Sequence, residues 1–348
     1  MVTLSQIQKS NALIPESLPP GTVSVFCGAT SGIGEYSLLH FAKYAPSPKI
    51  YFLGRSTQSG ERIKKECEQL NPEGEYHFIS TDLSLLGRVE EVCEVIKGQE
   101  DSLNLLFMSQ GLFTRSGKYF CEIDTPEGLV TAGAVVYYCK LRFILNLLPL
   151  MKKDASASLR RVVIPMTGTK EGKVFQDDWQ LRNSRSMLSQ RGHVASIVTL
   201  TMYRLARENP TVAFVHDFPG SVRSNLAREQ GALVRSLAAA WYSTLGKVIG
   251  TSEEECGERH VFYATSSRFA PRNADGGNSG VGRTEGMEVA MGVDGEKGSG
   301  AYVVDSYSEC AREASRNLVM GYVEDGTSDK LWQHAIGELL RVTGKERV

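Results

Sequence analysis

Short apolar runs alternate with amphipathic segments along most of the chain, from residue 22 to about residue 220. The apolar runs are rich in Val, Ile, Leu and Phe, which is typical of parallel strands that are buried on both faces. Such runs cover residues 22–27, 49–53, 76–80, 103–108, 161–166 and 212–218. Strands that alternate with helices indicate βαβ units, so the pattern predicts an α/β fold, a doubly wound parallel sheet with helices on both faces.

Two long segments between the strands have a helical pattern. Residues 127–148 contain no interior proline, and we expect one helix that ends near Pro149. Residues 186–208 predict a second long helix, which should stop before Asn209 because a proline follows it.

The regular alternation fades after residue 220. Residues 224–247 have a helical pattern, and a capping hydroxyl with an acidic first turn predicts another helix that starts near residue 251. The segment 271–300 is rich in Gly, Asn, Asp and Ser, so we expect an exposed excursion with a hairpin. Residues 301–304 are expected to form a last edge strand, and apolar residues over 331–340 predict a terminal amphipathic helix.

The composition restricts the partners and the compartment. The 39 Lys and Arg residues nearly cancel the 40 Asp and Glu residues, so there is no basic field that would attract nucleic acid or anionic lipid. The N-terminal residues lack a basic start followed by an apolar run, and we find no stretch of roughly 18 apolar residues that could span a membrane. We therefore expect a cytoplasmic protein with neither a nucleic-acid partner nor a membrane span.

The cysteines and histidines show no metal-ligand pattern. The 7 cysteines lie far apart without a C-x-x-C pair, and the 6 histidines form no H-E-x-x-H spacing. We expect reduced, buried thiols and no metal site.

A glycine-rich loop, Cys27–Gly34, directly follows the first predicted strand and opens the next helix. Glycines at this point let the backbone turn tightly and approach a pyrophosphate, whose charge then meets the N–H groups at the helix start. We therefore expect a dinucleotide cofactor here. The loop residues expected to contact it are Gly28, Thr30, Ser31, Gly32, Ile33 and Gly34.

The loop sequence C-G-A-T-S-G-I-G resembles the T-G-x-x-x-G-I-G pattern of the short-chain dehydrogenase/reductase family, with Cys27 in place of the threonine. Other segments at matching distances carry the same resemblance. They are Asp82-Leu83 after strand three, Gly111 after strand four, and Pro219-Gly220 with Val222 after strand six. By this resemblance, Asp82 contacts the adenine amine and the proline-glycine loop encloses the nicotinamide side.

The resemblance covers about residues 20–270. It implies a Rossmann fold in one domain, 1–348, in which residues 271–348 form a C-terminal extension with a hairpin and a terminal helix. Arg55 follows the second strand, where family members that prefer NADP commonly place an arginine on the 2′-phosphate. The resemblance therefore implies NADP(H) as the cofactor.

The catalytic residues depart from the family, whose members use a serine, a tyrosine and a lysine four residues after the tyrosine. Thr167 falls at the serine position and keeps the hydroxyl. The tyrosine and the lysine are missing: residues 174–246 contain no lysine, and their tyrosines are Tyr203 and Tyr242. Tyr203 lies too close to the proline-glycine loop to be the family's acid, and we expect it to pack in the core.

Two other side chains could supply the proton. Tyr138, or its neighbour Tyr137, could act as the acid with Lys140 as a nearby cation, although core packing of the tyrosines explains the same pattern. His193 is the other candidate, because an imidazole titrates near neutral pH, and its alternative is a hydrogen-bonded structural role.

Three functions remain open from the sequence. The chain looks similar to divergent fungal members of the family that tailor secondary metabolites, which implies an NADP(H)-dependent oxidoreductase for a small apolar polyketide or terpenoid. The missing tyrosine and lysine keep a non-redox isomerase or cyclase in view, and a non-catalytic dinucleotide-binding protein is the third alternative. Family members often pair through two long helices, so the resemblance is compatible with a homodimer.

Overall fold

The computed structural model describes most of the chain. The described residues are 2–111, 124–154, 157–183, 185–222, 250–274 and 279–345. They form a seven-stranded sheet in the order β3-β2-β1-β4-β5-β6-β7, in which every neighbouring pair is parallel. The strands are β1 (Val23–Cys27), β2 (Lys49–Gly54), β3 (Glu75–Ser80), β4 (Leu105–Met108), β5 (Arg161–Pro165), β6 (Ala213–Asp217) and β7 (Ala301–Val304). The predicted α/β fold and the predicted edge strand are confirmed.

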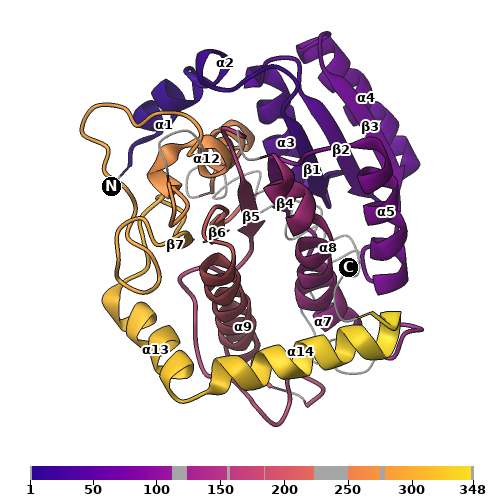
Figure 1. The fold of residues 1–348 in the computed structure, drawn as a ribbon, viewed down its shortest axis with the longest axis vertical. Coiled ribbons are helices and arrows are strands. Elements are labelled where there is room, and N and C mark those ends of the chain that lie inside the picture. The colour runs from indigo at the N-terminus through magenta and orange to yellow at the C-terminus, as the bar shows by residue number, and fades with distance from the viewer. Residues whose placement is uncertain are drawn as a thin grey trace.

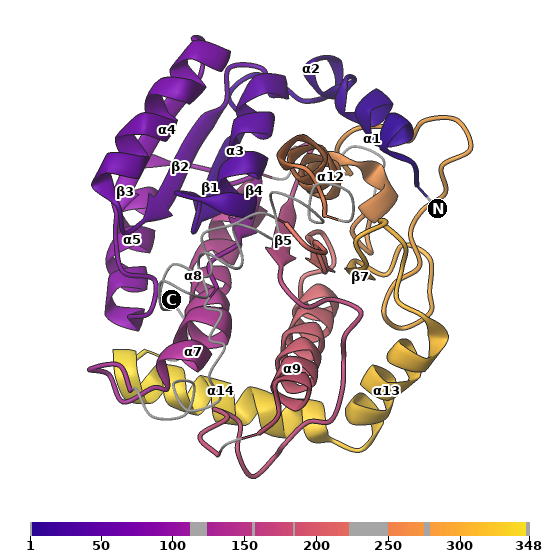
Figure 2. The same ribbon diagram turned by 180° about the vertical axis from the view of Figure 1, so that it is seen from behind.

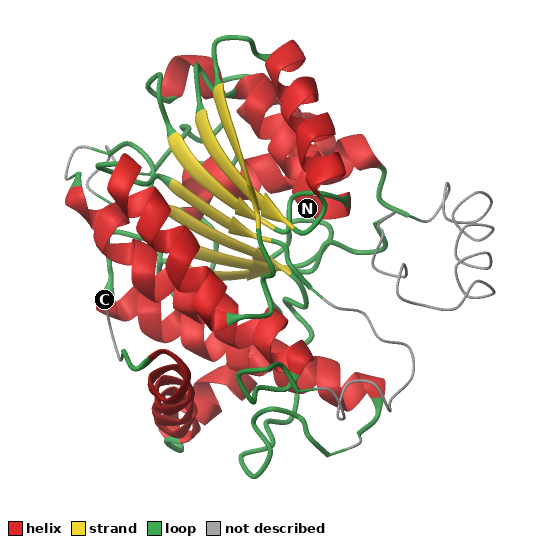
Figure 3. Ribbon diagram, turned by 90° about the vertical axis from the view of Figure 1, so that its right-hand side faces the viewer, coloured by secondary structure: helices red, strands yellow, loops and turns green. Residues whose placement is uncertain are grey.

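Helices cover both faces of the sheet, as Figure 3 shows. On one face lie α3 (Gly32–Tyr44), α4 (Thr57–Leu70) and α12 (Glu253–Thr265), with the short N-terminal helices α1 (Leu4–Asn11) and α2 (Ile14–Ser17) beside them. On the other face lie α5 (Leu86–Gln99), α8 (Cys139–Lys153) and α9 (Met187–Glu208). Successive strand residues feed two separate cores, since Phe26 packs with the first group of helices and Val25 with the second.

The helix predicted over 127–148 is built in three parts. It consists of α7 (Thr131–Gly133), a π-helical turn over Ala134–Tyr138 and α8. The prediction that it ends near Pro149 is wrong, because α8 continues to Lys153. A proline removes one backbone donor, and the burial of Leu147, Leu150 and Met151 in the core holds the last turn.

The same helix is long and apolar enough to cross a membrane by composition, although the sequence analysis found no such stretch. In the structure 89% of its most apolar window is buried inside the protein. Its apolar character is therefore that of a core helix.

The chain after β6 departs most from the sequence expectations. The helix predicted over 224–247 lies outside the described residues. Within the segment 271–300 an antiparallel bridge joins Met291 to Lys297 and closes a short hairpin. Helix α13 (Glu313–Glu324) was not predicted, whereas the terminal helix is present as α14 (Thr327–Thr343).

Helix α14 lies across the helix layer of α5, α8 and α9, as Figures 1 and 2 show. Its apolar stripe joins their core, and Asp329 forms an ion pair with Arg204 of α9 at 2.7 Å. Trp332 packs under the same guanidinium at 4.8 Å. In the described part of the chain, no large apolar side chain of α8 is exposed. The chain's own extension thus covers helices that the family resemblance assigned to a dimer.

We expect a monomer at micromolar concentration, because α14 occupies this surface. Sedimentation velocity should give a mass near 38.2 kDa. A species of twice that mass, unchanged by dilution, would contradict the expectation.

Candidate active site

The glycine loop joins β1 to α3, and the backbone leaves no space for a side chain at Gly28 or Gly34. Gly28 has a φ of +77°, and a Cβ atom there would lie 2.6 Å from the backbone nitrogen of Gln110. A Cβ at Gly34 would lie 2.6 Å from the carbonyl oxygen of Gly28. Ser31 precedes α3 without a side-chain capping bond in the described structure. The first amides of α3 therefore remain available to a phosphate.

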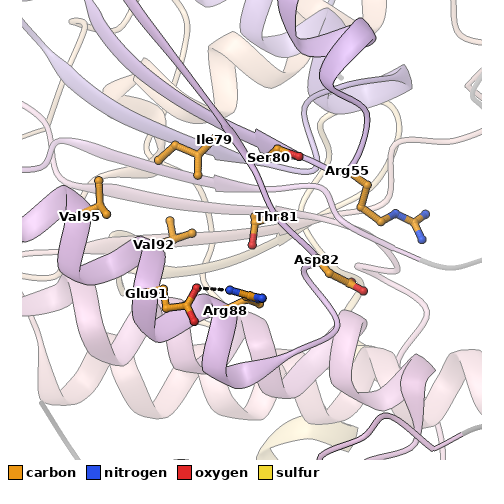
Figure 4. Close-up of a pocket in the computed structure, with 9 residues that line it drawn as sticks. All are labelled: Arg55, Ile79, Ser80, Thr81, Asp82, Arg88, Glu91, Val92 and Val95. Carbon is orange, nitrogen blue, oxygen red and sulfur yellow. Dashed lines mark hydrogen bonds and ion pairs between the residues drawn. The ribbon is translucent and has the colours of Figure 1, made fainter.

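A pocket of about 580 Å³ opens beyond the carboxyl ends of β2 and β3, beside α5 (Figure 4). Its lining consists of Arg55, Ile79, Ser80, Thr81, Asp82, Arg88, Glu91, Val92 and Val95. Figure 4 shows Arg55 and Asp82 at one end of the pocket and Val95 at the other. The volume and the position suit an adenosine, with the guanidinium groups of Arg55 and Arg88 near its rim.

Asp82 also has a structural role. Its carboxylate accepts hydrogen bonds from the amide and the hydroxyl of Ser84, at 3.0 and 2.8 Å, in the turn before α5. Asp82 remains exposed, whereas the neighbouring Leu83 is buried in the core. Leu83 therefore fixes the turn while the carboxylate faces the pocket.

Buried polar atoms without a protein partner follow the carboxyl ends of three strands. Within the described ranges they are the hydroxyls of Thr81 after β3, Thr167 and Thr169 after β5, and both amide atoms of Gln110 after β4. Unsatisfied buried polar groups are costly, so each suits a ligand that would bond to it. Together with the glycine loop, these residues fit an extended dinucleotide along this edge.

The sheet brings Thr167 next to the proline-glycine loop. Strands β5 and β6 are paired, with Pro165 opposite Asp217. Pro219 and Gly220 follow β6, and Val222 forms a bridge with Thr251. Gly111 follows β4 on the other side of β5. Most predicted site residues thus lie along one edge of the sheet, and their roles stay predictions.

The side chains of Tyr138 and Lys140 bind to different parts of the protein. The Tyr138 hydroxyl lies 2.7 Å from Nε2 of His334 on α14, and the Tyr137 hydroxyl lies 2.9 Å from that of Thr201 on α9. The Lys140 amine instead donates to the carbonyl oxygen of Met108 at 3.0 Å, at the end of β4. The geometry gives no support to a Tyr138–Lys140 pair in one pocket.

Both ring nitrogens of His193 form hydrogen bonds with backbone atoms. Its Nδ1 accepts from the Phe175 amide at 3.0 Å, and its Nε2 donates to the Trp179 carbonyl oxygen at 3.2 Å. Burial lowers the pKa of His193 to about 4. The structural role that the sequence left open for His193 therefore fits these contacts better than proton donation.

Sequence reasoning missed a polar chain at the end of β6. The Thr167 amide donates to Nε2 of His216 at 3.3 Å, and Nδ1 of His216 lies 2.9 Å from the Thr199 hydroxyl. Thr199 donates to Glu171 at 2.9 Å. His216 stands three residues before Pro219, which could have drawn attention to it. Nothing in the sequence pattern indicates Glu171, because its loop is irregular.

Comparisons with known proteins give the class and the fold of the chain. No protein-family model matches the chain. An oxidoreductase of Emericella nidulans, AN1596, is 34% identical over 338 residues, which are 96% of this chain and 97% of that protein. The short-chain dehydrogenase/reductase SAT2 of Stachybotrys chartarum is 26% identical and aligns over 97% of each chain. The L-sorbose reductase of Gluconobacter frateurii, solved with NADPH and L-sorbose, has a similar fold, with a TM-score of 0.53 and 15% identity over 77% of this chain and 97% of that one.

The chain belongs to the fungal oxidoreductases of the short-chain dehydrogenase/reductase type. It is an enzyme of this class, and the non-catalytic alternative is set aside.

Lys140 gives the site a pH-dependent stability. Burial lowers its pKa to about 7, and Cys27 and Asp217 oppose the shift. Above pH 7 the unfolded chain keeps a proton that the folded chain has released, so the folded state gains stability as the pH rises. Relative to Lys140→Met, the wild type should gain about 2 kcal/mol of unfolding free energy between pH 7.5 and 9.

Urea unfolding of both proteins at the two pH values measures this gain. A difference between them that does not change with pH would show that Lys140 ionises normally in the folded state.

Proposed function

We propose that the protein is an NADP(H)-dependent oxidoreductase that interconverts a carbonyl and an alcohol in a small apolar metabolite. The observation that carries the proposal is the strand, glycine turn and helix start at Gly28–Gly34, where the turn is too close for side chains at Gly28 and Gly34 and no side chain caps the first amides of α3. A nicotinamide bound along this edge would supply or accept a hydride. The NADPH in the similar L-sorbose reductase structure supports the same cofactor.

Different residues along the sheet edge would bind different parts of the cofactor and the substrate. Amides at the start of α3 would bind the pyrophosphate, and Arg55 would bind the 2′-phosphate. The Thr167 hydroxyl would donate a hydrogen bond to the reacting oxygen, because this hydroxyl is buried and has no partner among the described residues. Pro219 and Gly220 would enclose the nicotinamide side.

The substrate class rests on resemblance. The resemblance to fungal members that modify secondary metabolites supports a polyketide or terpenoid.

A non-redox isomerase or cyclase is the second candidate. One observation favours it: α9 has no lysine, and its tyrosine, Tyr203, lies too near the C-terminal end of the helix to be the family's acid. Conversion of a substrate to a product of equal mass, without oxidation of NADPH, would select this alternative.

Arg55→Ala should weaken NADPH binding about 10- to 100-fold, because a hydrogen bond to a charged group contributes about 1.5–3 kcal/mol. NADH has no 2′-phosphate, so its affinity should change less than about twofold. Isothermal titration calorimetry with both nucleotides measures the difference, and Arg204→Ala on α9 is the control. Equal losses for NADPH and NADH would refute the 2′-phosphate role, and a wild type that binds neither would refute the proposed function.

Thr167→Val should lower kcat about 100-fold, because it removes one donor to the reacting oxygen. Thr167→Ser keeps the hydroxyl and should retain most of the activity. The assay follows NADPH absorbance with trans-1-decalone, an apolar bicyclic ketone, as the probe. If the two variants lose activity equally while both bind NADPH, the hydroxyl is not the donor.

A further inference from the structure

Proton transfer in this enzyme needs a group in place of the family's tyrosine. Two buried polar side chains lie near the strand ends on the α8 and α9 side: Lys140 at the end of β4 and His216 beside Thr167 after β5. Lys140 is tied to Met108, whereas His216 directly contacts the Thr167 backbone. His216 is also the end of a continuous hydrogen-bonded chain that leads outward.

The hydrogen bonds define the direction of this chain. Thr199 has one hydroxyl proton and uses it in the hydrogen bond to Glu171. It must therefore accept the hydrogen bond from Nδ1–H of His216. Independently, Nε2 of His216 accepts from the Thr167 amide. Both contacts require the same neutral tautomer, with the proton on Nδ1 and a lone pair on Nε2.

Burial separates the two ends of the chain. His216 is fully buried, and Thr199 is 1% exposed. Glu171 is only partly buried, and its second oxygen accepts from Ser315 of α13 at 2.5 Å. Burial, with a smaller effect of the nearby Lys140, lowers the pKa of His216 to about 3. The imidazole is therefore neutral, and among the described residues Thr199 connects it by hydrogen bonds to the half-buried Glu171.

We propose that Glu171, Thr199 and His216 form a proton relay that serves the reacting oxygen beside Thr167. The proposal rests on the proposed oxidoreductase function. It supplies the proton transfer that the absent tyrosine and lysine perform elsewhere in the family, and it needs no charged imidazole.

The transfer balances in the direction of alcohol oxidation. The O–H bond of the alcohol breaks and its proton passes to Nε2, while the Nδ1 proton passes to the Thr199 oxygen and the Thr199 proton passes to the Glu171 carboxylate. An oxidised nicotinamide, when bound, would accept the hydride of the alcohol carbon, and the C–O bond would become a carbonyl. Glu171 then releases its proton to water. Ketone reduction is the same sequence in reverse, and it begins with one proton on Nε2 of His216 and one on the Glu171 carboxyl.

The Thr167 amide occupies Nε2 with a long bond, at 3.3 Å, and the relay requires the reacting oxygen to replace this amide as the partner of Nε2.

The first test needs no substrate. In protein labelled with ¹⁵N-histidine, NMR should show His216 as the neutral Nδ1–H tautomer, assigned by its loss in His216→Gln. Thr199→Val removes the acceptor of the Nδ1 proton and should move the Nδ1 resonance, while the Thr167 amide keeps the lone pair on Nε2, whereas Thr199→Ser should keep the wild-type spectrum. Thr201→Val, two residues further along α9 and bonded to Tyr137, is the matched control and should leave His216 unchanged. A wild-type ring protonated on Nε2, or one that Thr199→Val leaves unchanged, would overturn the relay.

The second test is kinetic, with NADPH and trans-1-decalone. Thr199→Val and Glu171→Gln should each lower kcat at least tenfold, with KM and the NADPH affinity within twofold of the wild type, because general acid–base groups contribute about 10²–10⁴-fold. Thr199→Ser should restore kcat, and the solvent deuterium isotope effect should rise in Glu171→Gln. Full kcat in both variants would refute the relay and leave the oxidoreductase function standing. A wild type that binds no NADPH would instead refute the function beneath it.

Discussion

The site depends on one close contact between two backbone segments. Gly28 lies so near Gln110 that a single methyl group at residue 28 would meet backbone atoms. This contact joins the turn after β1 to the end of β4, and Gly34 fits above it. Helix α3 can therefore begin directly at the sheet edge, with its first amides turned toward the place of a phosphate.

Because successive residues of a strand point to opposite faces, β6 places polar side chains on both faces of the sheet. His216 and Asp217 are consecutive in β6, so they point to opposite sides. His216 meets Thr199 of α9, whereas Asp217 lies 3.1 Å from His260 of α12. Burial disfavours the charged form of His260, but Asp217 and Cys256 together outweigh this effect and raise the pKa of His260 well above its usual value. This buried pair anchors α12 to the sheet behind the proposed relay.

The C-terminal extension packs against the helix layer and binds the Tyr138 side chain. Helix α14 places His334 against the Tyr138 hydroxyl, and Trp179 stacks on the same imidazole with ring centres 5.8 Å apart. A tyrosine that the sequence assigned to proton transfer is thereby engaged between two helices. Helix α14 also packs against α5 and α9, in the helix layer through which the resemblance suggested a homodimer.

The sequence by itself determined the strands, the glycine loop and the residues at the strand ends, because these depend on local patterns of burial and on backbone space at single positions. It placed Arg55, Asp82 and Thr167 at the sheet edge, since parallel strands bring their carboxyl ends together. Only the tertiary structure decided which polar side chains meet. Glu171, Thr199 and His216 come from a loop, a helix and a strand, and Tyr138 turns toward a helix almost 200 residues away in the chain. Such contacts depend on how the elements pack, and no local pattern of residues records that packing.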